Sequence, residues 1–418
     1  MINKTIFDNG IRVISEHIPH VRSVSVGIWV ANGSRHETRK VNGVSHFIEH
    51  LLFKGTPGRT SLDIAREIDS MGGLLNAFTG REFVCYYAKV LDAFLPRAVD
   101  LLADIFLNPL FDADELEKER QVILQEIRMH EDSPEDYISD LLFRSLWQDH
   151  PLGMSIIGSE ESVSGLSRDC ILAHKQDSYR AGDIVITAAG KVDHRELLKL
   201  LSGLFDSVPT GNGADSGAQP IYARHLGSHD KELEQVHCCF GVGALPQNHP
   251  QRYELCILNT ILGGSMSSRL FQEIREKEGL AYSIYSFLAS HSDAGALAVY
   301  AGTSRERLEE VIGITLREIR RMKNEALTSI ELDAAKEQLK GNIVLSLESS
   351  DNRMSKLAKN EIYFGCYQPL EEVMAGIDRV TAEGVLELAN TIFDDRHCTL
   401  QLMGELDGFR LKADDVIL

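Results

Sequence analysis

The hydrophobic and polar positions of the 418-residue chain alternate between strand-like and helix-like periods from the N-terminus onward. Residues 3–16 predict a hairpin, because two short apolar runs flank the turn Asp8-Asn9-Gly10. Ser23 to Val30 predicts a half-buried strand, with every second residue apolar. The same reading predicts helices at 43–55, 61–71, 92–107, 113–131, 135–147 and 195–205, a second hairpin at 74–79 and 83–90, and a strand at 184–189.

The same order of elements returns in the second half of the chain. Residues 236–242 predict a strand, and residues 253–262 predict the helix that follows it. The Glu-Ile pairs at 67–68 and 273–274 lie 206 residues apart and fix the register of the repeat. We therefore expect an internal duplication, an α+β fold of two homologous half-domains, each a mixed or antiparallel sheet covered by helices. Further repeated elements are expected at 269–277, 296–301, 305–324 and 329–348.

The first of the longer predicted helices carries polar residues at the spacing of metal ligands. His46 and His50 are four residues apart, so they lie one turn above each other, and Glu49 lies within about 100° of both. We expect Asn42 or Ser45 to cap this helix. Two imidazoles and an adjacent carboxylate suit a catalytic zinc ion, and the order His-x-x-Glu-His is that of the inverted zinc peptidases. An ordinary amphipathic helix with solvated polar residues explains the same pattern, so a third ligand is required.

The helix predicted at 113–131 offers acidic candidates for that third ligand. Glu119 and Glu126 are seven residues apart and therefore lie two turns apart on one face. Spacing alone does not choose among the acidic residues of this helix, which are most often solvated surface. The candidates are Glu115, Glu117, Glu119 and Glu126.

The second half of the chain lacks the metal-ligand pattern. In the register of the repeat, His46, Glu49 and His50 correspond to Arg252, Leu255 and Cys256 of the second half. Residues 209–220 lack large apolar side chains, which indicates an exposed linker. We therefore expect a metal-binding catalytic domain at 1–208, a linker at 209–222, and a second homologous domain without metal ligands at 223–418.

The composition excludes several classes of protein. Hydrophobic residues make up 43% of the chain and charged residues 25%, as in soluble globular proteins, and the apolar runs are too short to cross a membrane. Seven cysteines without a Cys-x-x-Cys pair favour reduced thiols, and with no signal-peptide pattern we expect a cytoplasmic location. The net charge of -19 disfavours nucleic acids and anionic membranes and mildly favours cationic partners.

Taken together, the motifs resemble those of the pitrilysin-type zinc peptidases. The His46-x-x-Glu49-His50 pattern is followed by Glu126 within residues 119–127, and the stretches 43–56, 75–79 and 131–136 are also similar to that family. The resemblance covers both halves in order and is strongest to bacterial two-domain proteins similar to the β subunit of the mitochondrial processing peptidase. The long glycine-rich loop of the mitochondrial non-catalytic subunit is absent, which disfavours that kind of presequence specificity.

The resemblance implies the chemistry and the residues of a site. It implies one zinc ion per chain held by His46, His50 and Glu126, with Glu49 as the general base. It also implies that Glu119 supports the site, as a carboxylate that orients a ligating imidazole by accepting its free N–H. The implied activity is that of a metalloendopeptidase or oligopeptidase that hydrolyses short unfolded peptides, with a weak preference for basic residues that follows from the acidic charge.

The same resemblance implies substrate-binding residues and a partner. Arg275 and Tyr282 match the arginine and tyrosine that face the metal from the opposing half-domain of the family. The substrate is expected as an added strand along Asn76, Ala77 and Phe78. A two-domain chain can present both halves of the site to each other only by pairing, so we expect a homodimer in which the site is shared between chains.

Three other interpretations remain open at this point. The chain could be a catalytically silent peptide-binding or scaffold subunit of a processing-peptidase-like complex, which a zinc assay with peptide turnover would distinguish. A different metal hydrolase or a metal-binding regulator is disfavoured by the duplication. A requirement for a second related subunit is disfavoured because the chain carries both halves of the site.

Overall fold

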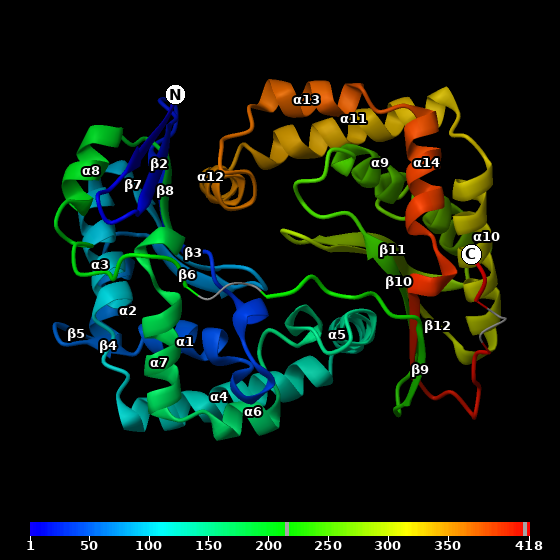
Figure 1. The fold of residues 1–418 in the computed structure, drawn as a ribbon, viewed down its shortest axis with the longest axis horizontal. Coiled ribbons are helices and arrows are strands. Elements are labelled where there is room, and N and C mark those ends of the chain that lie inside the picture. The colour runs from blue at the N-terminus through cyan, green and yellow to red at the C-terminus, as the bar shows by residue number, and fades with distance from the viewer. Residues whose placement is uncertain (214–216, 413–415) are drawn as a thin grey trace. The chain divides into compact units, whose positions relative to one another are not determined.

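The computed structural model describes residues 1–213, 217–412 and 416–418 as two compact units, each with its own sheet (Figure 1). The chain passes between the units several times, and the crossing between residues 217 and 218 lies within the expected linker 209–222. The described residues of this linker form no helix or strand, and residues 214–216 of the expected linker lie outside the described residues. The first unit comprises Met1–Arg128, Met154–Gly217 and Ser346–Tyr367, and the second comprises Met129–Gly153, Ala218–Leu345 and Gln368–Leu418.

The sheet of the first unit has six strands in the order β1-β2-β8-β3-β7-β6. Strands β2 and β8 are parallel, and the other neighbours are antiparallel. Both expected hairpins and the strand at 23–30 are confirmed. The strands are β1 (Ile2–Ile6), β2 (Arg12–His17), β3 (Ser23–Val30), β6 (Leu74–Thr79), β7 (Val84–Leu91) and β8 (Ile184–Gly190), beside a small pair formed by β4 (Gly55–Thr56) and β5 (Arg59–Thr60).

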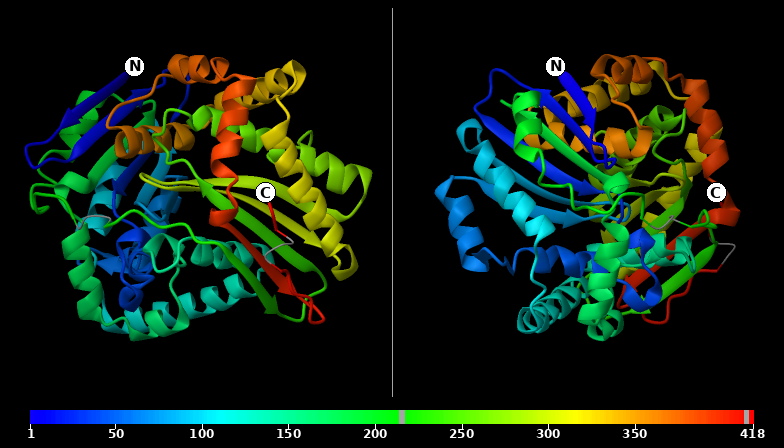
Figure 2. Two further views of the ribbon diagram at one scale, coloured as in Figure 1. Left: turned by 45° about the vertical axis from the view of Figure 1, so that its right-hand side comes forward. Right: turned by 60° about the vertical axis from the view of Figure 1, so that its left-hand side comes forward.

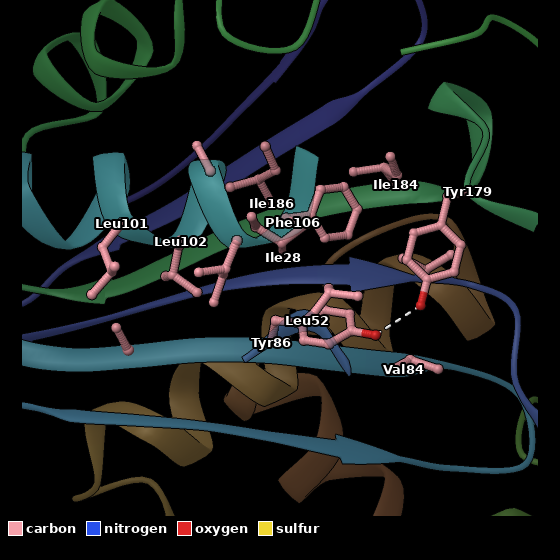
Figure 3. Close-up of a cluster of buried hydrophobic side chains, with 14 of the residues drawn as sticks. Ile28, Leu52, Val84, Tyr86, Leu101, Leu102, Phe106, Tyr179, Ile184 and Ile186 are labelled. Atoms are coloured by element: carbon pink, nitrogen blue, oxygen red, sulfur yellow. Dashed lines mark hydrogen bonds between the residues drawn. The ribbon is translucent and has the colours of Figure 1, made fainter. Parts of the chain in front are cut away.

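Most helices of the first unit enclose its main core on one face of the sheet, and α12 (Ser350–Phe364) covers the other face. Figure 3 shows part of this core, in which Phe106 of α3 lies among strand residues and the hydroxyl groups of Tyr86 and Tyr179 are hydrogen-bonded at 2.7 Å. The helix expected at 113–131 is confirmed at both ends. The helices are α1 (Val44–Leu52), α2 (Ser61–Ser70), α3 (Leu95–Leu107), α4 (Ala113–Glu131), α6 (Glu160–Gly165), α7 (Arg168–Ser178), α8 (His194–Leu201) and α12 (Ser350–Phe364).

The sheet of the second unit repeats the strand order of the first. Its order is β11-β12-β10-β13-β9, which matches β6-β7-β3-β8-β2 position by position, including the parallel pair at its end. Figure 2 (left) shows β13 in red beside the green strands of the same sheet. The expected α+β duplication is therefore confirmed. The strands are β9 (His225–Asp230), β10 (Val236–Ala244), β11 (Ala281–Ser290), β12 (Gly295–Thr303) and β13 (Cys398–Gly404).

The helices of the second unit include one irregular element. The segment expected as an α-helix at 269–277 is a π-helix over Phe271–Lys277. The sequence analysis did not predict β9, β13 or the helices after residue 348. The α-helices are α5 (Pro134–Leu146), α9 (Arg252–Leu262), α10 (Leu308–Asn324), α11 (Ser329–Ser346), α13 (Leu370–Asp378) and α14 (Ala382–Ile392).

Each unit contains one helix from the other half of the chain. Helix α12 packs on the first sheet, where Met354 and Leu357 share a buried cluster with Trp29. Helix α5 packs on the second sheet through Ile138 and Leu142. The two helices occupy equivalent places in the duplication, each directly after a long helix, α4 or α11. The expected domains 1–208 and 223–418 assign each of these helices to its own half of the chain. Periodicity identifies the buried face of a helix but not the sheet on which that face packs.

The exchange also corrects the expectation for β3. This strand was expected to be half buried, but both of its faces are buried, with Val24 in the main core and Trp29 under α12.

In the described part of the chain, no helix combines the length and the apolar character needed to cross a membrane.

Candidate metal centre

Helix α1 is fixed in place by its apolar face and by a buried carboxylate. Phe47, Ile48 and Leu51 are buried in the main core. The carboxylate of Glu37 accepts hydrogen bonds from the backbone N–H groups of Gly43 (2.7 Å) and Ser45 (2.8 Å) and from the amide of Asn42 (3.0 Å). The expected cap from Asn42 or Ser45 is therefore wrong, because Glu37 satisfies the orphan N–H groups from outside the helix.

The turn before α1 requires glycine at position 43. Gly43 has φ of +89°, and a Cβ atom there would lie 2.7 Å from the carbonyl oxygen of Ile157. Because an L side chain is strained at this φ and has no room, the start of the helix depends on this residue.

Three of the candidate ligands converge on one point. The Nε2 atoms of His46 and His50 each lie 3.6 Å from a carboxylate oxygen of Glu126 on α4. One ligand atom from each of the three residues lies within 4.8 Å of the others. Two imidazole nitrogens and one carboxylate oxygen form the donor set of a catalytic zinc site, so the residues fit this metal.

The local environment also suits metal binding. Burial, together with a smaller effect of the neighbouring His50, lowers the pKa of His46 to about 3, so the imidazole is neutral, as a metal ligand must be. The Nδ1 atom of His46 is buried and makes no hydrogen bond to the described residues, whereas its Nε2 atom faces Glu126.

The remaining glutamates of α4 have different partners. Glu119 is buried, and one of its oxygens lies 3.0 Å from Nδ1 of His50, on the side of the ring away from Glu126. Glu115 pairs with Lys118, and Glu117 pairs with Arg120. The helix therefore presents Glu126 to both histidines and Glu119 to one of them.

Glu49 lies beside this group without belonging to it. Its carboxylate is largely buried and accepts a hydrogen bond from the hydroxyl group of Thr79 at the end of β6. Burial raises the pKa of Glu49, against the opposing effects of Thr79 and His50. A carboxyl group with a raised pKa is suited to accept and return a proton near neutral pH.

The predicted substrate strand β6 lies at the edge of the first sheet. Ala77 and Thr79 face the core side that contains α1, whereas Phe78 contacts the rings of Trp29 and Tyr87 on the opposite face. Asn76 shares the face of Phe78 by the alternation of the strand. Of the three predicted substrate residues, only Ala77 presents its side chain toward the side of α1.

Arg275 and Tyr282 form a group of their own within the second unit. The guanidinium carbon of Arg275 lies 4.8 Å from the ring centre of Phe271 and 4.7 Å from that of Tyr282, and Arg275 donates a hydrogen bond to the carbonyl oxygen of Tyr282 (2.8 Å). The Tyr282 side chain remains 77% exposed. Arg275 lies in the π-helix, an element that frequently marks functional sites.

Sequence reasoning missed three residues that hold the predicted site or its helix in place. Glu37 caps α1, Thr79 binds Glu49, and Lys54 forms an ion pair with Glu119 at 2.6 Å. Lys54 carried a usable signal, since it lies four residues after His50 and can therefore reach the same neighbouring helix. Glu37 and Thr79 carried none, because both lie outside the predicted helix and its period does not describe the path of the chain around it.

Comparison with known proteins gives matches along most of the chain. Residues 12–160 match the family described as insulinase (peptidase family M16), and residues 165–339 match the peptidase M16 inactive domain. YmxG of Bacillus subtilis, named an uncharacterized zinc protease, is 40% identical over 395 residues, which cover 94% of this chain and 96% of that protein. An uncharacterized zinc protease of Mycobacterium leprae is 42% identical over 403 residues, which cover 94% of this chain and 90% of that protein.

Two solved structures share the fold. A structure described as a peptidase M16 inactive domain from Pseudomonas fluorescens superposes with a TM-score of 0.89 at 22% identity, and covers 96% of this chain and 98% of that chain. The structure of a protease from Helicobacter pylori superposes with a TM-score of 0.88 at 21% identity, and covers 97% of this chain and 99% of that chain. These similarities extend over both units.

Proposed function

Because the chain belongs to peptidase family M16, in which several bacterial relatives are named zinc proteases, we propose that it is a zinc-dependent endopeptidase for short unfolded peptides. The single observation that carries this proposal is the convergence of His46, His50 and Glu126. These residues would hold one zinc ion per chain. When bound there, zinc supplies a Lewis acid that activates water and polarises a peptide carbonyl group.

Glu49 is proposed as the general base. Its carboxylate lies beside the ligand group, and Thr79 fixes its orientation. It takes the proton of the attacking water and later delivers it to the leaving amine, which balances the proton over the cycle. Burial supports this role, because the raised pKa brings Glu49 closer to the pH at which it must both accept and donate.

The edge of β6 is the proposed site for the substrate. In the described residues β6 pairs only with β7, so its other edge can accept the main chain of an extended peptide. Main-chain pairing binds extended peptides with little dependence on sequence, and Ala77 is small enough to admit side chains of the substrate. A comparison of casein with oligopeptides of stated length tests the proposed preference for short unfolded chains.

Glu49→Gln tests the catalytic proposal. The variant should bind zinc as the wild type does but should hydrolyse a fluorogenic peptide at least about 10²-fold more slowly, since a general base contributes about 10²–10⁴-fold. Glu115→Gln on the outer part of α4 is the matched control and should retain activity. Chelation should abolish wild-type activity, and added zinc should restore it. Full activity of Glu49→Gln would remove the proposed role of Glu49.

The proposed homodimer rests on the resemblance and on the exposure of Tyr282. In it, Arg275 and Tyr282 of one copy complete the site of the other, with the Tyr282 hydroxyl group donating to the developing oxyanion. Mixing inactive Glu49→Gln and Tyr282→Phe chains should then restore part of the activity, because one site of each mixed dimer is wild type. Failure of the mixture to recover activity would contradict a shared site.

A further inference from the structure

Lys54 is held in a defined turn immediately after helix α1. Its backbone N–H group donates to the carbonyl oxygen of Leu51 at 3.1 Å. The next residue, Gly55, has φ of +126°, and a Cβ atom there would lie 3.1 Å from the carbonyl oxygen of Arg59. This turn fixes the backbone of Lys54 one helical turn beyond His50.

The side chain of Lys54 completes a chain of contacts that leads to the candidate metal centre. Its Nζ atom lies 2.6 Å from Oε1 of Glu119, and Oε2 of the same carboxylate lies 3.0 Å from Nδ1 of His50. Glu119 is only 6% exposed, so these contacts largely replace water around its oxygens. Each oxygen thus has a different partner, and the plane of the carboxylate is fixed between them.

Of the two imidazoles, only that of His50 has its outer nitrogen supported by these contacts among the described residues. Nδ1 of His46 is buried and has no hydrogen-bond partner among the described residues, whereas Nδ1 of His50 has Glu119. A ligating histidine depends on the acceptor at its second nitrogen for its tautomer and ring orientation. The orientation of His50 therefore depends on Glu119, and that of Glu119 depends on Lys54.

We propose that Lys54 is a positioning residue that acts through Glu119 to fix the His50 ring for metal binding. The inference rests on the proposed function, since it assumes that His50 is a zinc ligand. It goes beyond that function by assigning a role to a side chain that would contact neither the metal nor the substrate.

A general packing role for Lys54 is the competing explanation, and the structure separates the two. Helix α4 has a second anchor in Arg120, which donates hydrogen bonds to the carbonyl oxygens of Val163 and Leu166 and lies 5.4 Å from the ring centre of Phe47 on α1. Because this anchor does not involve Lys54, removal of the lysine should leave α4 in place and should affect chiefly the orientation of Glu119.

The first experiment measures zinc affinity by competition with a chromophoric chelator, in the full-length protein. Outer partners of ligating histidines typically contribute 10–100-fold in metal affinity. Lys54→Met should therefore bind zinc about 10-fold more weakly than wild type, and Lys54→Arg should recover most of the loss. Lys118→Met is the matched control, because Lys118 forms an ion pair of the same 2.6 Å length with Glu115 on the same helix but away from the ligands. The zinc affinity of Lys118→Met should equal that of the wild type.

The second experiment asks whether Lys54 acts through Glu119. Glu119→Gln should weaken zinc binding, and adding Lys54→Met to this variant should cause no further loss, because the proposed chain is already broken. Additive losses, or wild-type affinity in Lys54→Met, would overturn the inference. The unfolding temperature of the metal-free variants checks the fold, and Lys54→Gln, whose side chain is too short to reach, takes the place of Lys54→Met if that variant is unfolded.

Wild-type zinc binding is measured first, so that the two proposals fail separately. A wild-type chain that binds no zinc contradicts the proposed function itself. A wild-type chain that binds zinc, together with an unaffected Lys54→Met variant, contradicts only the role of Lys54.

Discussion

At the scale of single residues, Glu37 combines burial with a supporting role for helix α1. Burial raises its pKa to about 7, although the N–H groups of Ser45 and Gly43 and the Asn42 amide oppose this shift. A carboxyl group with a raised folded-state pKa binds its proton more tightly in the folded than in the unfolded protein. Its contribution to stability is therefore complete below about pH 4.5 and declines as the pH rises to about 7.

Glu37→Gln should expose this dependence. One pKa unit corresponds to about 1.4 kcal/mol, so the wild-type free energy of unfolding, relative to that of Glu37→Gln, should fall by about 3 kcal/mol between pH 4.5 and 7. Above pH 7 the difference should be constant. Urea unfolding of both proteins over this pH range measures it, and a difference that does not vary with pH would show that Glu37 keeps an ordinary pKa in the folded protein.

At the scale of secondary structure, the start of α1 depends on its preceding glycine. Gly43→Ala should lower the free energy of unfolding by about 1–2 kcal/mol for the left-handed backbone and about 1–3 kcal/mol more for the overlap with Ile157. Gly72→Ala is the matched control, because Gly72 has φ of +59° with open space around its Cβ position. This variant should lose only the about 1–2 kcal/mol that comes from the left-handed backbone. The Gly43 variant alone should also lose zinc affinity. Equal effects in the two variants would contradict a steric requirement at Gly43.

The same scale shows what the sequence could and could not predict. Elements with a clear local period, such as 23–30 and 113–131, were correctly placed because their pattern lies within the segment itself. The π-helix was not predicted, since an apolar period near 3.6 does not separate it from an α-helix. The helices after residue 348 were missed.

In the candidate site, too, the features set by local spacing were predictable and those set by tertiary packing were not. The spacing of His46 and His50 within one helix predicted that they share a face, and the structure brings them together. The third residue of the group came from the family resemblance, because four glutamates share α4 and periodicity cannot tell which one meets α1. Contacts made by tertiary packing alone, such as that of Thr79 with Glu49, had no local signal.

At the scale of the whole molecule, the exchange of α5 and α12 should make unfolding cooperative. Each sheet obtains one of its covering helices from the other half of the chain, so neither sheet is fully covered when the other half is unfolded. The chain has two tryptophans, both fully buried, with Trp29 in the first unit and Trp147 in the second. Variants that retain one of them report on one unit each.

The denaturation transitions seen by Trp29 and by Trp147 should therefore coincide. Met354→Ala, which removes a buried side chain of α12, should lower the stability reported by both probes by about 2–5 kcal/mol. Met266→Ala is the matched control, since this methionine is 76% exposed, and it should change neither transition appreciably. Two separate transitions, with only the Trp29 signal shifted by Met354→Ala, would show that the units unfold independently.

The late position of α12 in the chain has a consequence for synthesis. When residue 217 has been translated, every strand of the first sheet has been made, but the helix that covers Trp29 has not. The ribosome adds about 5–20 residues per second, so it needs roughly 7 to 30 seconds to go from residue 217 to the end of α12 at Phe364. The nascent chain should present an uncovered apolar sheet face to chaperones throughout this interval. A stop codon shortly before α12 should accordingly damage the fold of the half that was made first.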